Sequence, residues 1–360
     1  MPEVTSRVLD TEGMFEAAAG MPEQMAAAVV AAGVATEQIK AWTPAMVGPS
    51  EPWVREVVVF GMGGSGIAGD ILLATAGSQL PVPAVVVKSY ECPAFVGEDT
   101  LVFAISASGD TEETIDATTD AALAGARVVA VTGGGELARR AAGWGALVVP
   151  VPGNLPQPRS AVAAMSLPPL VVLEDLGLYR GARAWIGEAV AHLARRRDQL
   201  VAAGEGSAAA AIARRIGRTW PLLHGGGAVG AAAAMRWKTQ VNENAKSPAF
   251  CNRLPEACHN EVCGWGQAGD VSRQLLTLVQ LRHDAEHPQV RRRFDLVAEL
   301  MREVVANIVE VRATGDGDLA QLFDLILTGD FVSLWLAAQE GIDPGPVPIL
   351  VDLKDRLRVG

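Results

Sequence analysis

Residues 57–70 read VVVFGMGGSGIAGD, an apolar run followed by a cluster of glycines. The spacing of Gly61, Gly63 and Gly66 satisfies G-x-G-x-x-G, the pattern of a dinucleotide-binding turn. Such a turn can hold the pyrophosphate of a nicotinamide cofactor or the phosphate of a smaller ligand. The rest of the chain has to distinguish these two interpretations.

The glycine turn begins a series in which short β-branched runs alternate with stretches long enough for a helix. The runs are VVVF (57–60), AVVV (84–87), LVFAI (101–105), VVAVT (128–132) and LVVPV (147–151). This alternation predicts a parallel sheet with crossover helices. After a helical region over 160–215, a second series has runs at 220–227, 275–282 and 307–313. The predicted fold class is therefore α/β, with two mainly parallel sheets, each flanked by helices.

Composition excludes several classes of function. The 360 residues carry a net charge of −11, which argues against a nucleic-acid-binding protein. The start, MPEVTSRVLDTEG, lacks the features of a secretion signal, and no long apolar stretch is free of polar breaks. Four cysteines are too few for a disulfide scaffold. We therefore expect a cytoplasmic protein without a membrane span.

The segment CNRLPEACHNEVC (251–263) raises the alternative of a zinc site. It contains three cysteines and His259, but it has no C-x2-C pair, and its spacings fit none of the usual structural zinc patterns. Small buried thiols are the simpler interpretation. We expect no metal.

Two features favour a monophosphate over a dinucleotide at the glycine turn. The second predicted strand ends in Lys88, where a dinucleotide site usually has an acidic residue for the ribose. Ser65 lies inside the turn, and Ser106, Ser108 and Thr111 follow the third strand, at the same carboxyl edge of the sheet. Hydroxyls and helix-start N–H groups together can cradle an anion. The alternative is that these side chains are ordinary helix caps.

At this point a family resemblance becomes visible. GMGGSGIAGD and SASGDTEET resemble the sugar-isomerase (SIS) domain, a phosphosugar-binding α/β unit. Four further segments resemble the bifunctional phosphoglucose/phosphomannose isomerases: PQPRSA (156–161), RWKTQVNENAKSPAF (236–250), LPEACHNEVCGW (254–265) and DLK (352–354). The resemblance spans nearly the whole chain.

The resemblance implies a domain organisation and an assembly. We expect a helical N-terminal segment over 1–45, a first SIS domain over 46–180, a second over 181–342, and a C-terminal segment over 343–360 that returns to the active site. In that family two subunits form a dimer with active sites at the interface. The expected partners are therefore a hexose 6-phosphate substrate and a second copy of the chain, with no organic cofactor.

The resemblance also implies the roles of particular residues. The substrate phosphate is expected on Gly63, Gly64, Ser65, Ser106, Ser108 and Thr111. Glu243 is the implied catalytic base, His259 assists ring opening, and Arg159 lies beside the developing enediolate. Lys354 belongs to the ring-opening and positioning set. In relatives the histidine reaches into the partner subunit's site.

These residue types suit the chemistry of aldose–ketose isomerisation, which moves a proton between adjacent carbons through a cis-enediol. One carboxylate within reach of both carbons, such as Glu243, can carry that proton. A fixed guanidinium such as Arg159 can stabilise the negative enediolate oxygen. Sugar phosphates are mostly cyclic, and a histidine such as His259 is the side-chain type suited to moving the protons that open the ring. The remote phosphate supplies binding energy for orientation.

Each assignment has a structural alternative. Glu243 can be a surface carboxylate, His259 a histidine that donates to a backbone carbonyl, and Arg159 the partner of an acidic neighbour. Lys354 on an amphipathic terminal helix can simply be solvated. Only the three-dimensional arrangement can separate these alternatives from a catalytic site.

The sequence departs from the family pattern at two positions. Relatives commonly have an aromatic residue between the two serines and an asparagine after the glycine, where this chain has Ala107 and Asp110. A carboxylate beside a phosphate cradle is electrostatically unfavourable unless it points away or pairs with a base. If Asp110 caps the helix that follows it, the carboxylate stays off the ligand.

Three functions from different classes follow. The leading hypothesis is an isomerase that interconverts glucose 6-phosphate and mannose 6-phosphate with fructose 6-phosphate. The second is a phosphosugar-binding regulatory protein that has lost catalysis. The third, a nicotinamide-dependent dehydrogenase, depends on the glycine turn alone.

Overall fold

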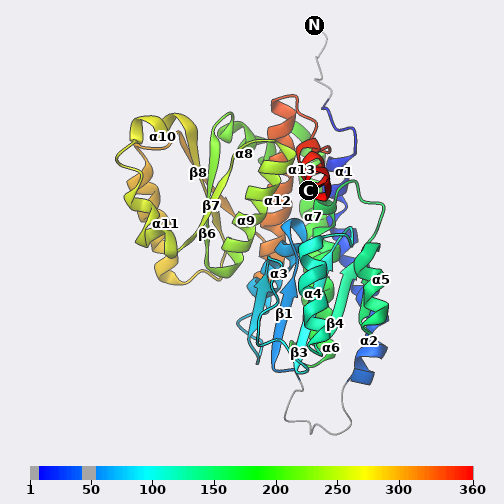
Figure 1. Ribbon diagram of the computed structural model, residues 1–360. Helices are drawn as coiled ribbons and strands as arrows, with labels where there is room; N and C mark the ends of the chain where they lie inside the picture. The colour runs from blue at the N-terminus through cyan, green and yellow to red at the C-terminus, as the bar shows by residue number, and fades with distance from the viewer. Residues whose placement is uncertain (1–7, 43–53, 360) are drawn as a thin grey trace.

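The computed structural model describes residues 8–42 and 54–359, which form two α/β domains (Figure 1). The first domain has a five-stranded, fully parallel sheet in the order β2-β1-β3-β4-β5. Its strands are β1 Glu56–Phe60, β2 Ala84–Val87, β3 Thr100–Ser106, β4 Arg127–Thr132 and β5 Leu147–Pro150. All five β-branched runs of the first series are therefore strands, as predicted.

Helices cover both faces of this sheet, which explains why its central strands are apolar without alternation. Helix α3 Gly63–Thr75 follows β1, α4 Glu112–Leu123 follows β3, α5 Gly135–Gly143 follows β4, and α6 Val162–Asp175 comes after β5. Apolar side chains of α4 and α5 pack on one face, while α3 and α6 pack on the other. The N-terminal helices α1 Met14–Ala19 and α2 Met21–Trp42 precede the domain, and α2 lies against α6.

The second domain has a four-stranded parallel sheet in the order β7-β6-β8-β9. The strands are β6 Trp220–Gly226, β7 Phe250–Leu254, β8 Leu276–Arg282 and β9 Asn307–Arg312. The sequence pattern predicted β6, β8 and β9. It missed the edge strand β7, because FCNRL has no apolar run.

Three helices of the second domain bury one face of its sheet, and two others lie on the opposite face. The first group is α8 Ala208–Ile216, α9 Gly227–Asn244 and α12 Gly317–Gln339, and the second is α10 Gly269–Leu275 and α11 Pro288–Met301. The long helix α7 Ala182–Ala203 connects the domains, and α13 Pro348–Val359 ends the described chain.

The two domains meet through the helices that follow their first strands, since α3 and α9 pack against each other. Helix α12 also lies along α9 and α7 in this central layer (Figure 1). By length and composition α12 could cross a membrane, but its apolar window is 94% buried inside the molecule. Its apolar sequence is thus accounted for by the protein core.

Candidate active site

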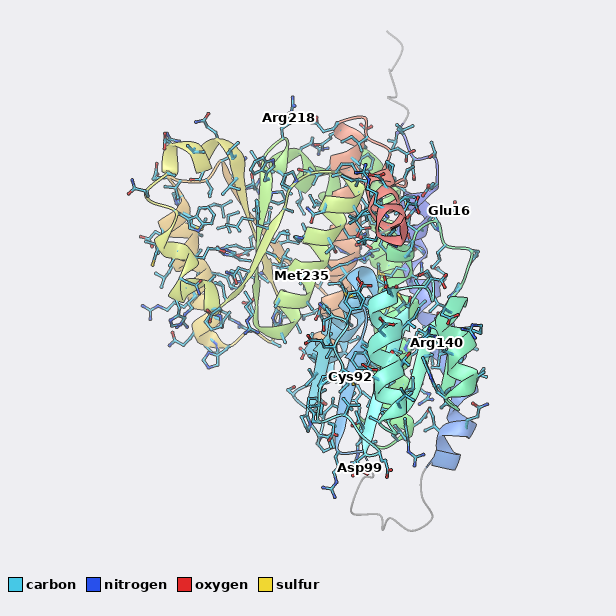
Figure 2. All side chains as sticks on the ribbon, viewed as in Figure 1. Glu16, Cys92, Asp99, Arg140, Arg218 and Met235 are labelled. Carbon is cyan, nitrogen blue, oxygen red and sulfur yellow. The ribbon has the colours of Figure 1, made fainter. Side chains whose placement is uncertain are left out.

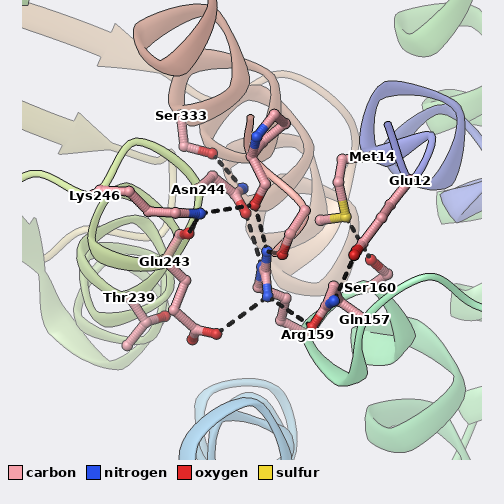
Figure 3. Close-up of polar contacts among 12 residues, drawn as sticks. Glu12, Met14, Gln157, Arg159, Ser160, Thr239, Glu243, Asn244, Lys246 and Ser333 are labelled. Carbon is pink, nitrogen blue, oxygen red and sulfur yellow. Dashed lines mark hydrogen bonds and ion pairs between the residues drawn. The ribbon is translucent and has the colours of Figure 1, made fainter. Parts of the chain in front are cut away.

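Arg159 is the centre of a polar cluster between the two domains (Figure 3). It lies on the short 3-10 helix η1 Pro158–Ala161, and only 3% of its surface is exposed. Its Nε donates to Asn244 Oδ1 at 2.8 Å, and its Nη2 donates to the carbonyl oxygens of Pro344 and Gly345 at 2.6 and 2.8 Å. Three sides of the guanidinium are therefore fixed by protein acceptors.

The remaining nitrogen, Nη1, has the longest contacts. It donates to Gln157 Oε1 at 3.2 Å and to Glu243 Oε2 at 3.4 Å. The Glu243 side chain is 27% exposed, so its carboxylate is accessible as well as paired with Arg159. Nη1 is thus the part of the guanidinium that can most readily exchange a protein acceptor for a ligand oxygen.

Burial lowers the pKa of Arg159, and the nearby Glu243 carboxylate offsets part of that effect. An arginine starts from so high a pKa that it keeps its charge in this site. A buried guanidinium beside a carboxylate is an electrostatic feature typical of functional sites.

Further side chains from α9 and α12 fix the position of Arg159. Arg236 on α9 donates from Nη2 to the carbonyl oxygen of Arg159 at 2.9 Å and pairs with Asp330 of α12 at 2.8 Å. Asn244 Nδ2 donates to Ser333 Oγ at 2.9 Å. By contrast, Arg140 and Arg218 lie on the outside of the molecule (Figure 2). The buried arginines are held by elements from both domains.

The glycine turn abuts this cluster. A Cβ atom on Gly64 would lie 3.4 Å from the Cα of Arg159, so the turn passes directly against η1. Gly63 has φ +51°, a conformation that favours glycine, and faces open space. Ser65 is buried, and Ser65 Oγ accepts a bond from the N–H of Ala107 at 3.4 Å. The structure therefore brings the predicted phosphate turn to Arg159.

The hydroxyls after β3 gather at the same edge of the sheet. The oxygens of Ser106 and Thr111 are 2.9 Å apart, and Ser106 Oγ accepts from the N–H of Gly109 at 3.0 Å. Ser108 is exposed, and its Oγ accepts from the N–H of Asp110 at 3.2 Å. Thr111 is the N-cap residue of α4 but makes no side-chain capping bond. Ordinary helix capping thus does not explain Thr111.

Asp110 points away from the turn, but the helix it caps is not the one that follows it. Its Oδ1 accepts from the N–H of Glu136 at 2.9 Å, in the first turn of α5. The expectation that Asp110 caps α4 was therefore wrong. The carboxylate therefore joins the loop after β3 to the start of α5.

Lys88, which directly follows β2, forms an ion pair with a residue of α3. Its Nζ lies 2.5 Å from Asp70 Oδ2 of α3, and burial raises the pKa of Asp70 although Lys88 opposes that effect. The position that would bind a ribose in a dinucleotide site thus holds an ion pair within the protein.

Lys246 is a site residue that sequence reasoning missed. Its Nζ donates to the carbonyl oxygens of Glu243 and Pro344 at 2.6 and 3.1 Å. Burial lowers the pKa of Lys246, and the charge of Arg159 lowers it further. Among the described residues it is the one non-glycine position with positive φ, at 53°. The quoted NENAK segment contained it, but nothing in the sequence placed it beside residue 344.

Residues 343–345 form a strap over Arg159 that is tied to the N-terminal segment. Thr11 Oγ1 donates to Asp343 Oδ2 at 2.5 Å, and the N–H of Gly345 donates to Asp343 Oδ1 at 3.2 Å. Glu12 accepts from Gln157 Nε2 at 2.7 Å. The expected C-terminal segment therefore starts at the site, and its link to residues 11 and 12 is a relationship that the sequence did not predict.

His259 and Lys354 are not part of this cluster. His259 is exposed on the 3-10 helix η3 Glu256–His259, just beyond the carboxyl end of β7. That end of β7 pairs with Gly226, immediately before α9 begins, whereas Glu243 is near the far end of α9. The helical rise from residue 227 to residue 243 is about 24 Å. Lys354 is exposed on α13, beyond the strap.

The fold and the cluster define a protein built from two SIS domains. A family model for the SIS domain matches residues 54–149, and one described as the bacterial phospho-glucose isomerase C-terminal SIS domain matches residues 205–357. A solved tagatose-6-phosphate ketose/aldose isomerase from Escherichia coli shares the fold with a TM-score of 0.69 and 16% identity, over 92% of this chain and 93% of that one.

Curated relatives narrow this class to one family. A bifunctional phosphoglucose/phosphomannose isomerase from Caldicellulosiruptor bescii is 33% identical over 346 residues, covering 96% of this chain and 98% of the relative. One from Aquifex aeolicus is 33% identical over 305 residues, covering 84% and 91%. The chain belongs to the bifunctional phosphoglucose/phosphomannose isomerase family.

Proposed function

We propose that this chain interconverts glucose 6-phosphate and mannose 6-phosphate with fructose 6-phosphate through a cis-enediol intermediate. The observation that carries the proposal is the position of Arg159, whose Nη1 is 3.4 Å from Glu243 and whose Cα abuts the glycine turn at Gly64. A base, a cation and an anion cradle thus lie side by side. A regulatory phosphosugar binder has no need of the base.

In this proposal the phosphate is anchored at the edge of the first sheet. Backbone N–H groups at Gly63 and Gly64 face it from the start of α3, with the helix dipole favouring negative charge. The N–H of Ser65 donates to the carbonyl oxygen of Met62 at 2.9 Å, so Ser65 contributes its hydroxyl. The Ser106, Ser108 and Thr111 hydroxyls add neutral donors. Holding the remote phosphate there leaves C1 and C2 to be positioned toward Arg159 and Glu243.

The proton transfer then uses the two side chains that already touch. The Glu243 carboxylate removes the proton from C2 of the open-chain aldose, and the electron pair forms the C1–C2 double bond of the enediolate. The bonds of Nε and Nη2 fix the Arg159 guanidinium in place, so that Nη1 can stabilise the negative oxygen of the enediolate. The proton on O2 passes to O1, and Glu243 returns the carbon-bound proton to C1 as the C2–O2 carbonyl forms, which gives the ketose.

Ring opening requires a further side chain that transfers protons. We assign this role to His259 of a second subunit. Within one chain His259 lies at the carboxyl edge of the second sheet, at the opposite edge from Glu243. This separation supports an active homodimer in which each site takes its histidine from the partner. We assign Lys354, which is exposed on α13 after the strap, to the same set. No metal or organic cofactor has a role, and the enzyme is proposed to work in the cytoplasm.

The domain limits form part of the proposal. We assign residues 1–45 to a helical N-terminal segment, 46–180 and 181–342 to the SIS domains, and 343–360 to the C-terminal segment. The boundary at 45 and 46 lies outside the described residues. The bonds of Arg159 to the carbonyl oxygens of residues 344 and 345 support a C-terminal segment that returns to the site.

A coupled assay tests the activity. Glucose 6-phosphate and mannose 6-phosphate are offered separately in the presence of EDTA, and released fructose 6-phosphate is detected. We expect turnover of both. Binding without turnover of either sugar would favour the regulatory alternative, and loss of activity with chelator would contradict metal-free catalysis.

Subunit complementation tests the shared site. His259→Ala and Glu243→Gln chains, each inactive alone, are mixed in equal amounts after dissociation. Because a mixed dimer contains one intact site, the mixture should recover about a quarter of the wild-type activity. Absence of any recovery, with mixed dimers verified by mass spectrometry, would place His259 outside the partner's site.

A further inference from the structure

The second domain contains a second copy of the glycine turn. Residues 225–230 read GGGAVG, so that Gly225, Gly227 and Gly230 repeat the spacing of Gly61, Gly63 and Gly66. The repeat spans the end of β6 and the start of α9, as the first turn lies between the end of β1 and the start of α3. β1 and β6 are also equivalent in their sheets, because each lies second in the strand order.

The two turns share their backbone geometry. Gly63 and Gly227 have φ values of +51° and +60°, and a Cβ on either would meet only open space. In each turn the first and last glycines press together: a Cβ on Gly66 would lie 2.8 Å from the oxygen of Gly61, and a Cβ on Gly225 would overlap Gly230. Neither α3 nor α9 has a side-chain cap. By backbone alone, the second turn is as suited to an anion as the first.

Strand register aligns the facing loops as well. Phe60 pairs with Ala104, and the equivalent His224 pairs with Gln280. Counting on from these pairs, the loop 106–111 before α4 corresponds to 282–287 before α11, with no insertion. The cradle residues Ser106, Ser108, Asp110 and Thr111 therefore correspond, in that order, to Arg282, Asp284, Glu286 and His287.

In the second domain the carboxylate of this loop is buried beside the turn, whereas its counterpart in the first domain is exposed. Glu286 is 4% exposed and accepts from Arg282 Nε at 3.0 Å and from the N–H of His283 at 3.0 Å. Its Cγ would lie 3.3 Å from a Cβ on Gly226, the residue just before α9. Asp110, the equivalent carboxylate, is exposed and turned toward α5.

Arg282 is the positive group of this second cradle. It is 3% exposed, lies 4.2 Å above the ring of Phe294, and bonds Glu286 with Nε. Its Nη1 donates to Glu310 Oε2 at 2.9 Å, but Glu310 is 43% exposed on its side chain and lies toward solvent. A buried guanidinium needs a buried anion, and here that anion is the carboxylate of Glu286.

We propose that Glu286 is a built-in anion that closes the second glycine turn, and that removing this carboxylate converts the turn into a phosphate site with Arg282 as its cation. The inference rests on the proposed function in one respect, namely that the first turn holds a phosphate. The native chain then has one phosphosugar site, although the fold provides two glycine turns of the same geometry.

The test compares Glu286→Ala with Glu310→Ala, which removes the exposed carboxylate that Arg282 Nη1 contacts at 2.9 Å. The third carboxylate near Arg282, on Asp295, lies 4.0 Å away and is kept in both variants. Melting temperatures are measured with inorganic phosphate and with sodium chloride of equal ionic strength. Phosphate should raise the melting temperature of Glu286→Ala by several degrees more than that of the wild type or Glu310→Ala. Adding Arg282→Met to Glu286→Ala should abolish the extra shift. Equilibrium dialysis with labelled phosphate should give one site per wild-type chain and two per Glu286→Ala chain.

Several outcomes overturn the inference. Equal phosphate shifts in both variants, or two sites on the wild-type chain, would show that Glu286 does not close the turn. If Glu286→Ala is insoluble, Glu286→Gln keeps the side-chain volume and is measured in the same way; an unchanged phosphate response there has the same meaning. If the wild type binds no phosphate, the proposed function fails, while a phosphate site that appears only in the Glu286 variants still supports the closure.

Discussion

Arg159 Nη1 lies 3.4 Å from Glu243 Oε2, while the other nitrogens of the same guanidinium are bonded to acceptors at 2.6–2.8 Å. The five N–H groups of Arg159 thus all have an acceptor, and the contact to the proposed base is the longest. A substrate oxygen that replaces Glu243 at Nη1 would free the carboxylate to act on the adjacent carbon. Binding of the substrate at Arg159 and activation of Glu243 as a base are therefore linked.

Glu243→Gln should lower kcat by about 10²–10⁴-fold, because the amide cannot accept the C2 proton. The amide oxygen can still accept from Arg159, so the KM for glucose 6-phosphate should change little. Steady-state kinetics and calorimetric binding separate these two effects. Glu16→Gln, on the outside of α1 (Figure 2), is the control and should leave kcat unchanged. Wild-type turnover in Glu243→Gln would remove this residue from its role.

Arg159→Lys should reduce kcat by about 10²–10³-fold, the usual loss when an oxyanion donor is removed. A lysine has only three donors for the five acceptors around Arg159, and it cannot reproduce the planar guanidinium geometry. The melting temperature should also fall, because buried carbonyl groups lose their partners. Arg140→Lys, on the surface helix α5, is the matched control. A fully active Arg159→Lys enzyme would contradict the proposed role.

Asp110 should affect stability more than catalysis. Asp110→Ala removes the bond to the N–H of Glu136 and should cost about 1 kcal/mol, the usual value for a lost helix cap. Asp110→Asn keeps an acceptor oxygen while removing the charge, so it should retain the stability of the wild type. Denaturant unfolding measures the stability of both variants and of the wild type. Steady-state kinetics measures the KM of each protein for glucose 6-phosphate. A KM that falls more than tenfold in Asp110→Asn would show that the carboxylate repels the substrate phosphate.

Asp343 should make the strap sensitive to acid. Burial raises the pKa of Asp343, but hydrogen bonds from Thr11 and the N–H of Gly345 outweigh it, so the pKa lies below its ordinary value of 3.8. A lowered carboxyl pKa contributes stability that is complete above the unfolded-state value and is lost as the pH falls through the folded-state value.

The corresponding measurement is the melting temperature of wild type and Asp343→Asn across pH. The difference between them should be constant from about pH 8 to about pH 5 and should shrink below about pH 4. Asp99→Asn, at an exposed surface pair, is the control. A difference that is already lost at pH 5, or persists unchanged at pH 3, would contradict the account of the strap.

Much of the fold could be predicted from the sequence because its signals are local. The β-branched runs that became β1, β3 and β4 are buried on both faces, and buried parallel strands read as continuous apolar segments. The edge strand β7 was missed because its residues are mostly half-exposed and include Asn252 and Arg253. Its pairing with β6 is a tertiary contact.

The site was predictable only in part, for the same reason. Residues inside recognisable segments, such as Ser106, Arg159 and Glu243, were identified from sequence. The family resemblance implies that residues 343–360 return to the site, but the contact of Lys246 and the bonds from Arg159 to the strap were not identified, because they join positions about a hundred residues or more apart. The cap on α5 likewise depends on where Asp110 meets a loop 26 residues later. Strand register, which alone reveals the correspondence between the two glycine turns, has no local signature either.

The most direct test of the central claim is isomerisation of glucose 6-phosphate in deuterated water, followed by NMR of the fructose 6-phosphate formed. Proton transfer through an enediol on Glu243 predicts solvent deuterium at C1 of the product, and no such exchange with Glu243→Gln. The proton held by Glu243 exchanges with solvent in a fraction of turnovers, so product that stays free of deuterium at C1 after prolonged equilibration of both sugars would indicate direct hydride transfer between the carbons. That result would contradict the role of Glu243 as the base.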